Sequence, residues 1–491
     1  MMRASSIPFD MVPRRAAVLS VLALTLALSA CAVGPDYQRP GIDVGTGYKE
    51  GQDKVPGWKP AQPGDTAQRG PWWTLYGDPV LNDLMGRLDA ANQSIAAAEA
   101  NYRQAQALVQ GARAGFYPTV GVSADATRSG GKGTSSSNSS RLSSVSSVDN
   151  QYSLTGSVSW EADVWGKLRR TLEASRASAQ ASEADLAATR LSAQSTLAQT
   201  YFALRVMDRQ KKLLEETIDA YQRSLQLTQN RYQVGVSGKS DVAVATTQLE
   251  NTRAQSIDLD WQRSQLEHAI AVLTGQPPSQ FSLPPEVFEQ QVPEIPVDVP
   301  SALLERRPDV ASAERNAAAA NAKIGVAVSA WYPDLTLSAD GGFRSSLLGD
   351  LLTVPARFWS IGPSLALTVF DGGARQSQVD QARAAYDAQA ATYRQTVLTA
   401  LKEVEDYLAQ LRSMQAEQVV QNRALASARE SLQLMLNQYK AGTVDYLSVA
   451  TVQATALSTE RSTLSLTGSR LTASVQLIAA MGGGWEGLTA R

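Results

Sequence analysis

The sequence predicts a mainly α-helical protein that also contributes four β-strands to a membrane β-barrel, and three observations lead to this fold class. Residues 167–234 and 374–441 contain neither Pro nor Gly, so each stretch can form one very long helix. Four other segments alternate apolar and polar residues with the period of a strand. The same order of elements occurs twice, roughly 210 residues apart, which indicates an internal two-fold sequence repeat.

The repeat is visible in short motifs. Phe116-Tyr117-Pro118 has a counterpart in Trp331-Tyr332-Pro333, and residues 230–235 resemble residues 437–442. Each half is therefore predicted to form a helix, two strands joined by a loop, a very long helix, a short turn and a returning helix.

The composition excludes several classes of protein. Of the 491 residues, 43% are hydrophobic and 19% are charged, which provides a core and argues against a disordered chain. The net charge of −2 leaves no basic surface of the kind that binds nucleic acid. A single His and a single Cys argue against a zinc or His-rich metal site, a disulfide framework and a His-based triad. We therefore expect no cofactor, no metal and no catalytic residue, and a structural, binding or transport role.

The N-terminus has the pattern of a secretory signal peptide, which we place at residues 1–30. Arginines precede an apolar stretch, residues 16–30, that is too short for a comfortable transmembrane helix. It ends in Leu28-Ser29-Ala30-Cys31, which resembles a bacterial lipobox, so we expect Cys31 to carry covalent lipid. Ala32 follows. An Asp at that position would resemble the signal that retains lipoproteins in the inner membrane, so its absence favours the outer membrane. The alternative is a free or buried Cys after an ordinary signal peptide.

Four alternating segments predict strands with one apolar face and one wet face. Aromatic residues near the strand ends fit the interfacial girdle of a membrane barrel. The alternative is four strands of a soluble sandwich. The apolar rows are Val120, Val122, Ala124 and Ala126; Tyr152, Leu154, Gly156, Val158, Trp160, Ala162 and Val164; Leu335, Leu337, Ala339, Gly341 and Phe343; and Trp359, Ile361, Pro363, Leu365, Leu367 and Val369.

Four strands are too few to close a barrel, since known single-chain barrels start at about eight strands. Exposed strand edges do not occur in lipid, because every backbone polar group needs a partner there. Several chains must therefore share one barrel. Three copies would supply about twelve strands around a water-filled lumen lined by Ser, Thr and Asp side chains.

The two stretches without Pro or Gly would each span roughly 100 Å as a single helix. Apolar residues recur along them in steps of three and four, which indicates coiled-coil seams. Gly235 and Gly442 can end these helices, and helices at about 239–274 and 445–481 then return. The result is two helical hairpins per chain. The alternative is a pair of shorter, broken helices.

These elements divide the chain into eight segments. The signal peptide is residues 1–30, and a lipidated N-terminal segment with the first helices is residues 31–115. The remaining segments are a strand pair with an extracellular loop at 116–165, the first long helical hairpin at 166–275, a linker with equatorial helices at 276–330, the second strand pair at 331–371, the second long hairpin at 372–482 and a C-terminal tail at 483–491.

Four groups of motifs, taken in order, resemble those of one family. They are LSACAVGPDYQRP at 28–40; Trp72-Trp73 with residues 76–81; Arg307-Pro308-Asp309-Val310 with Ala313-Glu314-Arg315 and Tyr332-Pro333; and Phe370-Asp371-Gly372-Gly373 with Arg375. Over about residues 31–485 the chain is similar to outer-membrane efflux lipoproteins of the NodT/OprM type, which are relatives of TolC.

This resemblance implies a TolC-like homotrimer with a shared 12-stranded outer-membrane barrel and a periplasmic α-barrel of long coiled-coil helices. It implies a tripartite pump, in which a periplasmic adaptor (a membrane fusion protein) and an inner-membrane transporter pass small molecules such as drugs and toxic compounds to this exit duct. It further implies a lipid-anchored protein that extends from the outer membrane into the periplasm and has no catalytic step of its own.

In the relatives, the hairpin tips close the periplasmic mouth and contact the adaptor, and the matching tips here are residues 234–242 and 441–447. The resemblance makes Asp445 and Tyr446 candidates for the periplasmic gate; the alternative for Asp445 is an N-cap of the last helix. Relatives often carry Leu-Asp-Ala-Gln just after the tip, whereas both halves here read Val-Ala-Thr. The candidate adaptor contacts are Gly235, Ser240, Asp241 and Gly442.

Two features that invite a catalytic interpretation have simpler explanations. Arg307-Pro308-Asp309 fits a helix start, with Pro308 in the first turn and Asp309 near the positive end of the helix dipole. His268 lies on a returning helix as a structural or solvated residue.

Three rival functions are a passive porin, which needs eight or more strands in one chain, a lipid-anchored coiled-coil spacer, which needs no strands, and an envelope enzyme, which lacks a convincing set of residues.

Overall fold

The computed structural model of the chain describes residues 32–42, 48–50, 70–134, 144–286, 292–293 and 307–483. The chain forms two compact units, each built from three separate stretches. Unit 1 contains Met1–Pro40, Arg103–Gln180 and Glu314–Ala391, and unit 2 contains Gly41–Tyr102, Ala181–Ala313 and Thr392–Arg491.

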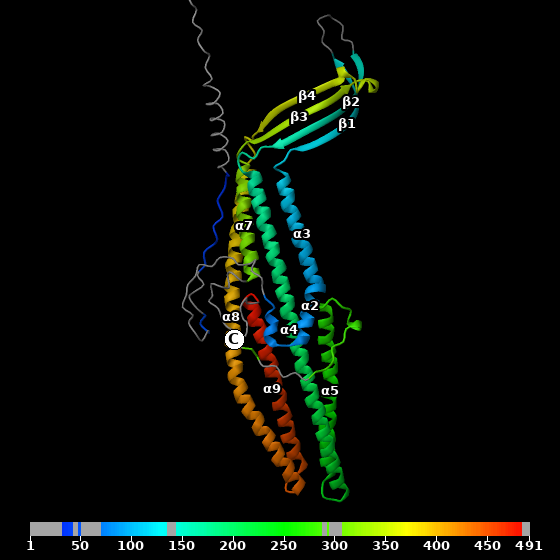
Figure 1. Cartoon of the computed structure of the whole chain (residues 1–491), viewed down its shortest axis with the longest axis vertical. Coiled ribbons are helices and arrows are strands. Elements are labelled where there is room, and N and C mark those ends of the chain that lie inside the picture. Colours follow the sequence, from blue (N-terminus) through cyan, green and yellow to red (C-terminus); the bar gives the residue numbers. More distant parts are fainter. Residues whose placement is uncertain are drawn as a thin grey trace, which may run out of the picture. The chain divides into compact units, whose positions relative to one another are not determined.

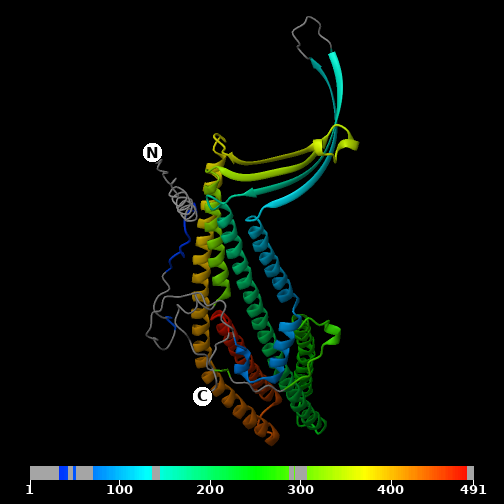
Figure 2. The ribbon, with the colours of Figure 1, turned by 45° about the horizontal axis from the view of Figure 1, so that its top comes forward.

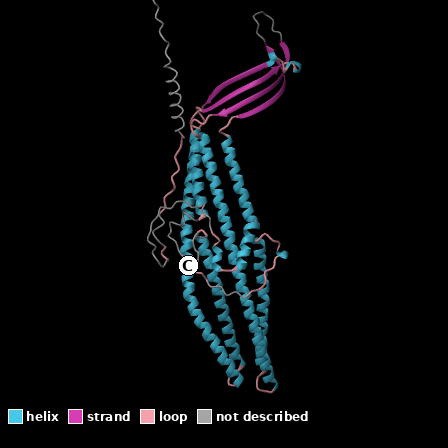
Figure 3. Ribbon diagram, in the orientation of Figure 1, coloured by secondary structure: helices cyan, strands magenta, loops and turns pink. Residues whose placement is uncertain are grey.

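The two halves of the chain contain the same elements in the same order (Figures 1 and 3). Each half has a 22-residue helix, two strands, a helix of 67 or 68 residues and a helix of 35 residues. The first half has α3 (Gln93–Ala114), β1 (Thr119–Thr134), β2 (Ser144–Glu161), α4 (Lys167–Gln233) and α5 (Lys239–Leu273). The second half has α7 (Pro308–Ser329), β3 (Asp334–Ser345), β4 (Arg357–Ala366), α8 (Ala374–Ala441) and α9 (Tyr446–Ala480).

Both long helices are continuous, so the expectation of single helices is confirmed and the alternative of broken helices is wrong. Shorter elements complete the chain: η1 (Trp72–Tyr76), α2 (Pro79–Ala91), η2 (Pro278–Gln280), η3 (Leu348–Asp350) and η4 (Val354–Ala356). Across the described part of the chain, every helix is too short or too polar to cross a membrane.

Unit 1 holds a four-stranded antiparallel sheet in the order β1-β2-β3-β4. The sheet is curved, as Figure 2 shows. Strands β2 and β3 approach each other so closely at Gly342 that a side chain would not fit there, because a Cβ atom on Gly342 would lie 2.0 Å from the carbonyl oxygen of Leu154. Gly156 pairs with Gly341 next to this contact. Glycine therefore allows β3 to approach β2 closely at this place.

The alternating pattern places the apolar residues on one face of this sheet, as the sequence predicts. Val120 is 74% exposed, Trp359 80% and Ile361 76%, so this apolar face is not covered by the described part of the chain. The expected rows continue too far, because β2 ends at Glu161 and β4 at Ala366. Beyond those points, aspartates accept backbone N–H groups of the next helices and turn the chain out of the sheet.

These two aspartates show how each long helix begins. The Asp163 carboxylate accepts the N–H groups of Leu168 and Arg169, both at 3.0 Å. In the second half, the Asp371 carboxylate accepts the N–H groups of Gly373 and Arg375 at 3.0 and 3.2 Å. A carboxylate satisfies N–H groups that have no partner within the helix, and its charge suits the positive end of the helix dipole.

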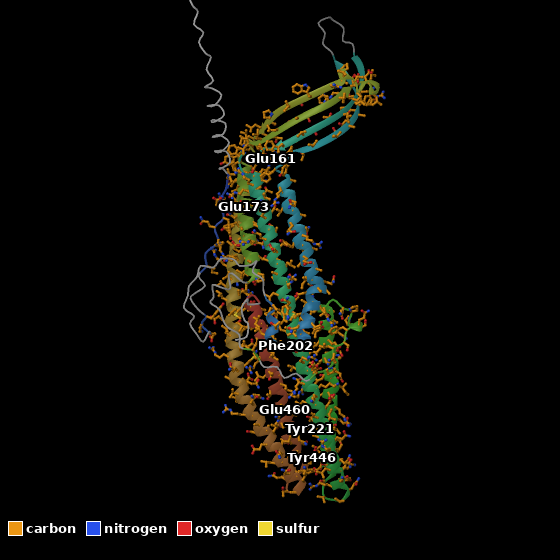
Figure 4. All side chains as sticks on the ribbon, in the orientation of Figure 1. Glu161, Glu173, Phe202, Tyr221, Tyr446 and Glu460 are labelled. Carbon is orange, nitrogen blue, oxygen red and sulfur yellow. The ribbon has the colours of Figure 1, made fainter. Side chains whose placement is uncertain are left out.

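Unit 2 has its main core around the short N-terminal elements, where η1 and α2 pack against α4, α5 and α9. Phe202, labelled in Figure 4, is fully buried, and its ring lies 4.8 Å from the ring of Tyr76. The Tyr76 hydroxyl shares a 2.7 Å hydrogen bond with that of Ser474, and Tyr201 donates to the Asp78 carboxylate at 2.6 Å. The buried hydroxyl groups are thus satisfied.

The Arg307-Pro308-Asp309 motif has the structural role that the sequence predicts. The helix α7 begins at Pro308, and the Arg307 guanidinium donates to Asp309 at 2.6 and 3.0 Å and to Glu403 at 2.6 Å. Burial alone would lower the pKa of Arg307, but the two carboxylates outweigh it and the net pKa is raised. This motif joins the start of α7 to α8 by an ion pair in which the arginine is buried and the carboxylates are partly exposed.

Candidate functional site

The two helical hairpin tips carry most of the residues that the sequence marks as functional, and both lie in unit 2. The first tip joins α4 to α5 and the second joins α8 to α9. At both tips a glycine with positive φ ends the long helix: Gly235 at 78° and Gly442 at 80°. Only glycine adopts this backbone conformation without strain, and it allows the chain to turn sharply.

The first tip is exposed and held mainly by backbone contacts. The Gly235 N–H donates to Tyr232 O at 3.0 Å, and the Val236 N–H donates to Arg231 O at 2.8 Å. Val234 and Val236 are 74% and 62% exposed. Three predicted adaptor contacts lie here: Gly235 and Ser240 are exposed, and Asp241 is half-buried in the first turn of α5.

The second tip has the same backbone bonds, from the Gly442 N–H to Tyr439 O at 3.0 Å and from the Thr443 N–H to Gln438 O at 3.1 Å, and it adds side-chain contacts. Asp445 is the N-cap of α9, and its carboxylate accepts the Ser448 N–H at 3.0 Å. The alternative reading of Asp445 as an N-cap is therefore confirmed, and the side chain itself stays exposed. The next residue, Tyr446, is fully buried, and its ring meets that of Tyr439 edge-on at 5.6 Å.

A cross-link joins the first hairpin to the second just above the tips. The Arg231 guanidinium donates to Tyr439 O at 2.5 Å, and its Cζ lies 4.6 Å from the centre of the Tyr439 ring. The Tyr439 hydroxyl shares a 2.8 Å hydrogen bond with that of Thr228. Deeper in the hairpins, the Gln453 amide donates to Ser224 Oγ at 3.3 Å. These bonds connect α4 with α8 and α9, and we call them the tip cross-link.

Three residues of the tip cross-link are buried, and Arg231 and Ser224 are half-buried. Thr228 and Tyr439 are 0% and 2% exposed, and Gln453 is 3% exposed. Burial, followed by the neighbouring Tyr221 and Tyr439, raises the pKa of Tyr446 to about 12. Figure 4 shows Tyr221 and Tyr446 near each other in this part of the helices. In such surroundings a hydrogen bond is stronger than in water, and an unpaired group is costly.

The structure thus gives the two residues predicted for the gate different surroundings. Asp445 is exposed and caps a helix, whereas Tyr446 points into the packed interior of the chain. Cys31, the expected lipidation site, lies outside the described residues. His268 is exposed on α5.

Sequence reasoning missed the tip cross-link. Arg231 and Tyr439 stand in the repeated motifs at 230–235 and 437–442, so the repeat marked both positions. It gave no sign that Arg231 of one motif contacts Tyr439 of the other, because side-chain contacts between distant helices depend on how the helices pack. Among the residues whose positions are described, no three His, Cys, Asp or Glu side chains converge as they would to hold a metal ion.

The sheet with one exposed apolar face and the two very long helical hairpins have counterparts in solved outer-membrane channels. The outer-membrane channel OprN superposes with a TM-score of 0.79 at 29% sequence identity, over 93% of this chain and 100% of that one. The family model described as outer membrane efflux protein matches residues 84–276 and 299–483. This chain belongs to the outer membrane efflux protein family, and its place is the outer membrane.

Two curated relatives extend over nearly the whole chain. The toluene efflux pump outer membrane protein TtgC of Pseudomonas putida is 29% identical over 472 residues, which cover 95% of this chain and 96% of the relative. The cation efflux system protein CusC of Escherichia coli is 28% identical over 467 residues, which cover 94% and 98%. The family and these relatives are transport proteins rather than enzymes.

Proposed function

We propose that this chain forms the exit duct of a tripartite efflux pump, as a homotrimer whose three copies close one barrel. The observation that carries this proposal is the incomplete sheet of unit 1. Its outer strands, β1 and β4, each have one partner among the described strands, and its apolar face is exposed. In lipid both edges need partners, and strands of neighbouring copies can supply them. Three sheets give about twelve strands.

The polar face of the sheet suits a water-filled lumen. Ser157 pairs with Asp340 and Ser159 with Ser338 across β2 and β3, and these side chains lie opposite to the apolar row. Ser360 donates to the Asp340 carboxylate at 3.3 Å. A lumen lined by hydroxyl and carboxylate groups passes hydrated solutes without a binding pocket. The duct then needs no catalytic step and no cofactor of its own.

The helix tips would form the periplasmic gate and the docking site for a periplasmic adaptor. In a trimer, three copies of the exposed Asp445 would form an anionic ring, while the buried Tyr446 holds the turn that carries it. The exposed valines beside Gly235 offer an apolar surface to an adaptor, with Ser240 and Asp241 in the next turn of the same tip and Gly442 in the second tip. The tip cross-link would hold the gate closed until the adaptor separates the two hairpins.

The pump's partners would supply energy and choose the cargo. One relative is named for toluene and another for cations, yet both match this chain along its whole length. Such different cargo on one architecture fits selection by an inner-membrane transporter, which an adaptor would link to this duct. The lipid on Cys31 would anchor each protomer in the membrane, because several acyl chains hold more firmly than one.

Single-channel recording tests the gate. Arg231→Gln removes the charged bond of the tip cross-link, and bonds of this kind contribute about 1.5 kcal/mol or more, so the open probability should rise roughly tenfold. Arg223→Gln, an exposed arginine two turns earlier on α4, is the matched control and should leave the channel unchanged. Equal open probabilities in the two variants would remove the cross-link from the gate.

Drug export separates the duct from the rival functions. Deleting the gene should raise the sensitivity of cells to several exported compounds, and only in strains that hold a matching adaptor and transporter. A passive porin predicts reduced uptake instead, and a coiled-coil spacer predicts unchanged export. Unchanged susceptibility in every such strain would count against the duct.

A further inference from the structure

The segment directly after the expected lipidation site, residues 32–37, packs against other residues of unit 1, and we call the place where it packs the slot. The Val33 N–H donates to Trp165 O at 3.0 Å, just after the end of β2. On the other side of the segment, the Asn321 amide of α7 donates to Pro35 O at 3.0 Å. Residues 32–37 are thus tied to elements from both halves of the chain.

Glycines allow the backbones in this slot to touch. Gly34 has a φ of 95°, and a Cβ atom on it would lie 2.5 Å from the Cα atom of Gly325. A Cβ atom on Gly325 would lie 2.8 Å from Cγ of Arg170. A Cβ atom on Gly166 would lie 2.9 Å from Cα of Ala32. A side chain at Gly34 or Gly166 would push the segment out, and one at Gly325 would displace the arginine that binds it. The close approach therefore depends on three glycines.

A buried arginine donates hydrogen bonds to the backbone of the segment. The Arg170 side chain is 6% exposed, and its guanidinium donates to Val33 O at 3.3 Å, Gly34 O at 3.4 Å and the Asp36 carboxylate at 2.8 Å. Glu173, labelled in Figure 4, accepts a further bond from it at 2.8 Å. If the segment left, Arg170 would lose three of these acceptors and keep the bond to Glu173.

Tyr37 makes the last contact of the slot. Its hydroxyl donates to the Glu314 carboxylate at 2.8 Å, and Glu314 is 3% exposed. The Arg315 guanidinium holds the other oxygen of this carboxylate at 2.5 Å. A buried carboxylate at the start of the unit 1 part of α7 is therefore satisfied in part by the N-terminal segment.

The slot opens beside an aromatic pair at the base of the sheet. The Trp165 ring stacks on the Tyr332 ring with centres 4.9 Å apart, and the Trp165 Nε1–H donates to Pro333 O at 2.9 Å. Trp and Tyr gather where a membrane meets water. The segment leaves the slot at Ala32, one residue after Cys31, and one residue spans at most about 3.6 Å.

We propose that Gly34, Arg170 and Gly325 form an anchor slot that fixes the acylated N-terminus against the base of β2 and β3. The acyl chains then lie along the apolar row of the sheet, near Trp160 and Leu337, as a fixed part of the membrane-facing surface. The N-terminal segment acts as a positioning element for the lipid, and a flexible tether would leave the lipid at no particular strand. This proposal rests on the proposed lipidation of Cys31.

A photoreactive fatty acid, incorporated by growing cells, tests where the lipid lies. After irradiation of membranes that hold the full-length protein, peptide mapping should find cross-links at the end of β2 and the start of β3. Gly325→Val fills the slot and should lower these cross-links about tenfold, since bonds to a charged group are lost. Gly86→Ala is the matched control, because a Cβ atom on this helical glycine meets nothing within 4 Å.

A second measurement does not depend on the lipid. Hydrogen exchange should find the Val33 amide protected in the wild type and exposed in Gly325→Val. Tyr37→Phe removes the hydroxyl that donates to Glu314, so it keeps the slot testable if the valine variant fails to fold, and it should weaken protection and cross-linking together.

The outcomes separate the slot from the lipidation. A wild type without incorporated fatty acid but with a protected Val33 amide would refute the lipid on Cys31, and with it the fixed position of the acyl chains, while leaving the peptide slot intact. An unprotected Val33 amide in the wild type, or identical cross-link maps in the wild type and a folded Gly325→Val variant, would overturn the anchor slot.

Discussion

The two helical hairpins have the same length and the same glycine at the turn, yet their tips are held in different ways. At the first tip, Gly238 is the N-cap of α5 and makes no side-chain capping bond within the described residues. At the second tip, Asp445 caps α9, and the buried rings of Tyr439 and Tyr446 pack beneath it. Both turns thus have the same backbone hydrogen bonds, and the second adds a side-chain cap and a buried aromatic pair.

This difference shows what duplication kept and what it changed. The repeat conserves the features that give two equal hairpins: helix length, a positive-φ glycine and an aspartate at the start of each long helix. The side chains at the tips have diverged, and they divide two tasks. The second tip is the fixed point of the tip cross-link, and the first tip reaches it through Arg231 while presenting its valines to solvent.

Removing the ring beneath the second tip should have the largest effect. Tyr446→Ala leaves a cavity at a site that is fully buried, and truncation of a large aromatic core residue costs about 3–5 kcal/mol. Hydrogen exchange of the amides at the start of α9 should therefore accelerate by roughly a hundredfold or more. Tyr232→Ala at the first tip removes a ring that is 46% exposed and should change exchange there far less. Similar acceleration at both tips would contradict the contrast between them.

High pH should loosen the second tip before the first. Burial raises the pKa of Tyr446 to about 12, so the folded protein disfavours the charged tyrosinate more than the unfolded chain does. The stabilisation is fully present below about pH 10, the ordinary pKa of tyrosine, and is lost as the pH rises through 12. Tyrosinate absorbance together with hydrogen exchange at α9 measures this. In Tyr446→Phe the loosening between these values should be smaller, and an unchanged pH profile would exclude Tyr446 as its source.

The sequence was sufficient to predict the helices and strands, because these elements follow from local residue patterns. The lack of Pro and Gly from Lys167 onward predicts α4 to within one residue of its observed end, and alternation predicts all four strands. The strand ends were placed too late, since alternation alone does not reveal that Asp163 and Asp371 bind helix N–H groups. The tip cross-link and the anchor slot join residues more than a hundred positions apart, so their contacts follow from packing that no local pattern encodes.

Removing the cap of the second tip should have a moderate effect. Asp445→Ala loses the bond to the Ser448 N–H and leaves that N–H without its capping oxygen, so the start of α9 should be less stable. Asp445→Asn keeps a capping oxygen and loses the charge, so it should retain helix stability and still alter the cation preference of the open channel. Thermal unfolding and reversal potentials measure the two effects. If both variants behave alike in both measurements, the capping and charge roles of Asp445 are not separable.

The same cap is sensitive to acid. Hydrogen bonds from the side chain and backbone N–H of Ser448 lower the pKa of Asp445, so the folded state favours the carboxylate. Its stabilisation is present above the ordinary pKa of aspartate, about 3.9, and is lost as the pH falls through the lower folded value. Hydrogen exchange at the start of α9 over this acid range should show the loss in the wild type and not in Asp445→Asn.

Giving the first tip the cap that it lacks should have the smallest effect and sharpens the comparison most. Gly238 has extended backbone angles of −76° and 159°, which any residue adopts, and a Cβ atom there would meet only the flexible Ser240 hydroxyl at 3.0 Å. Gly238→Asp should therefore stabilise the start of α5 by a few tenths of a kcal/mol, about the difference between glycine and aspartate at an N-cap. If the first tip must yield for the gate to open, this small gain should lower the open probability measurably. A tip that is stabilised with no change in gating would place the moving part elsewhere in the hairpins.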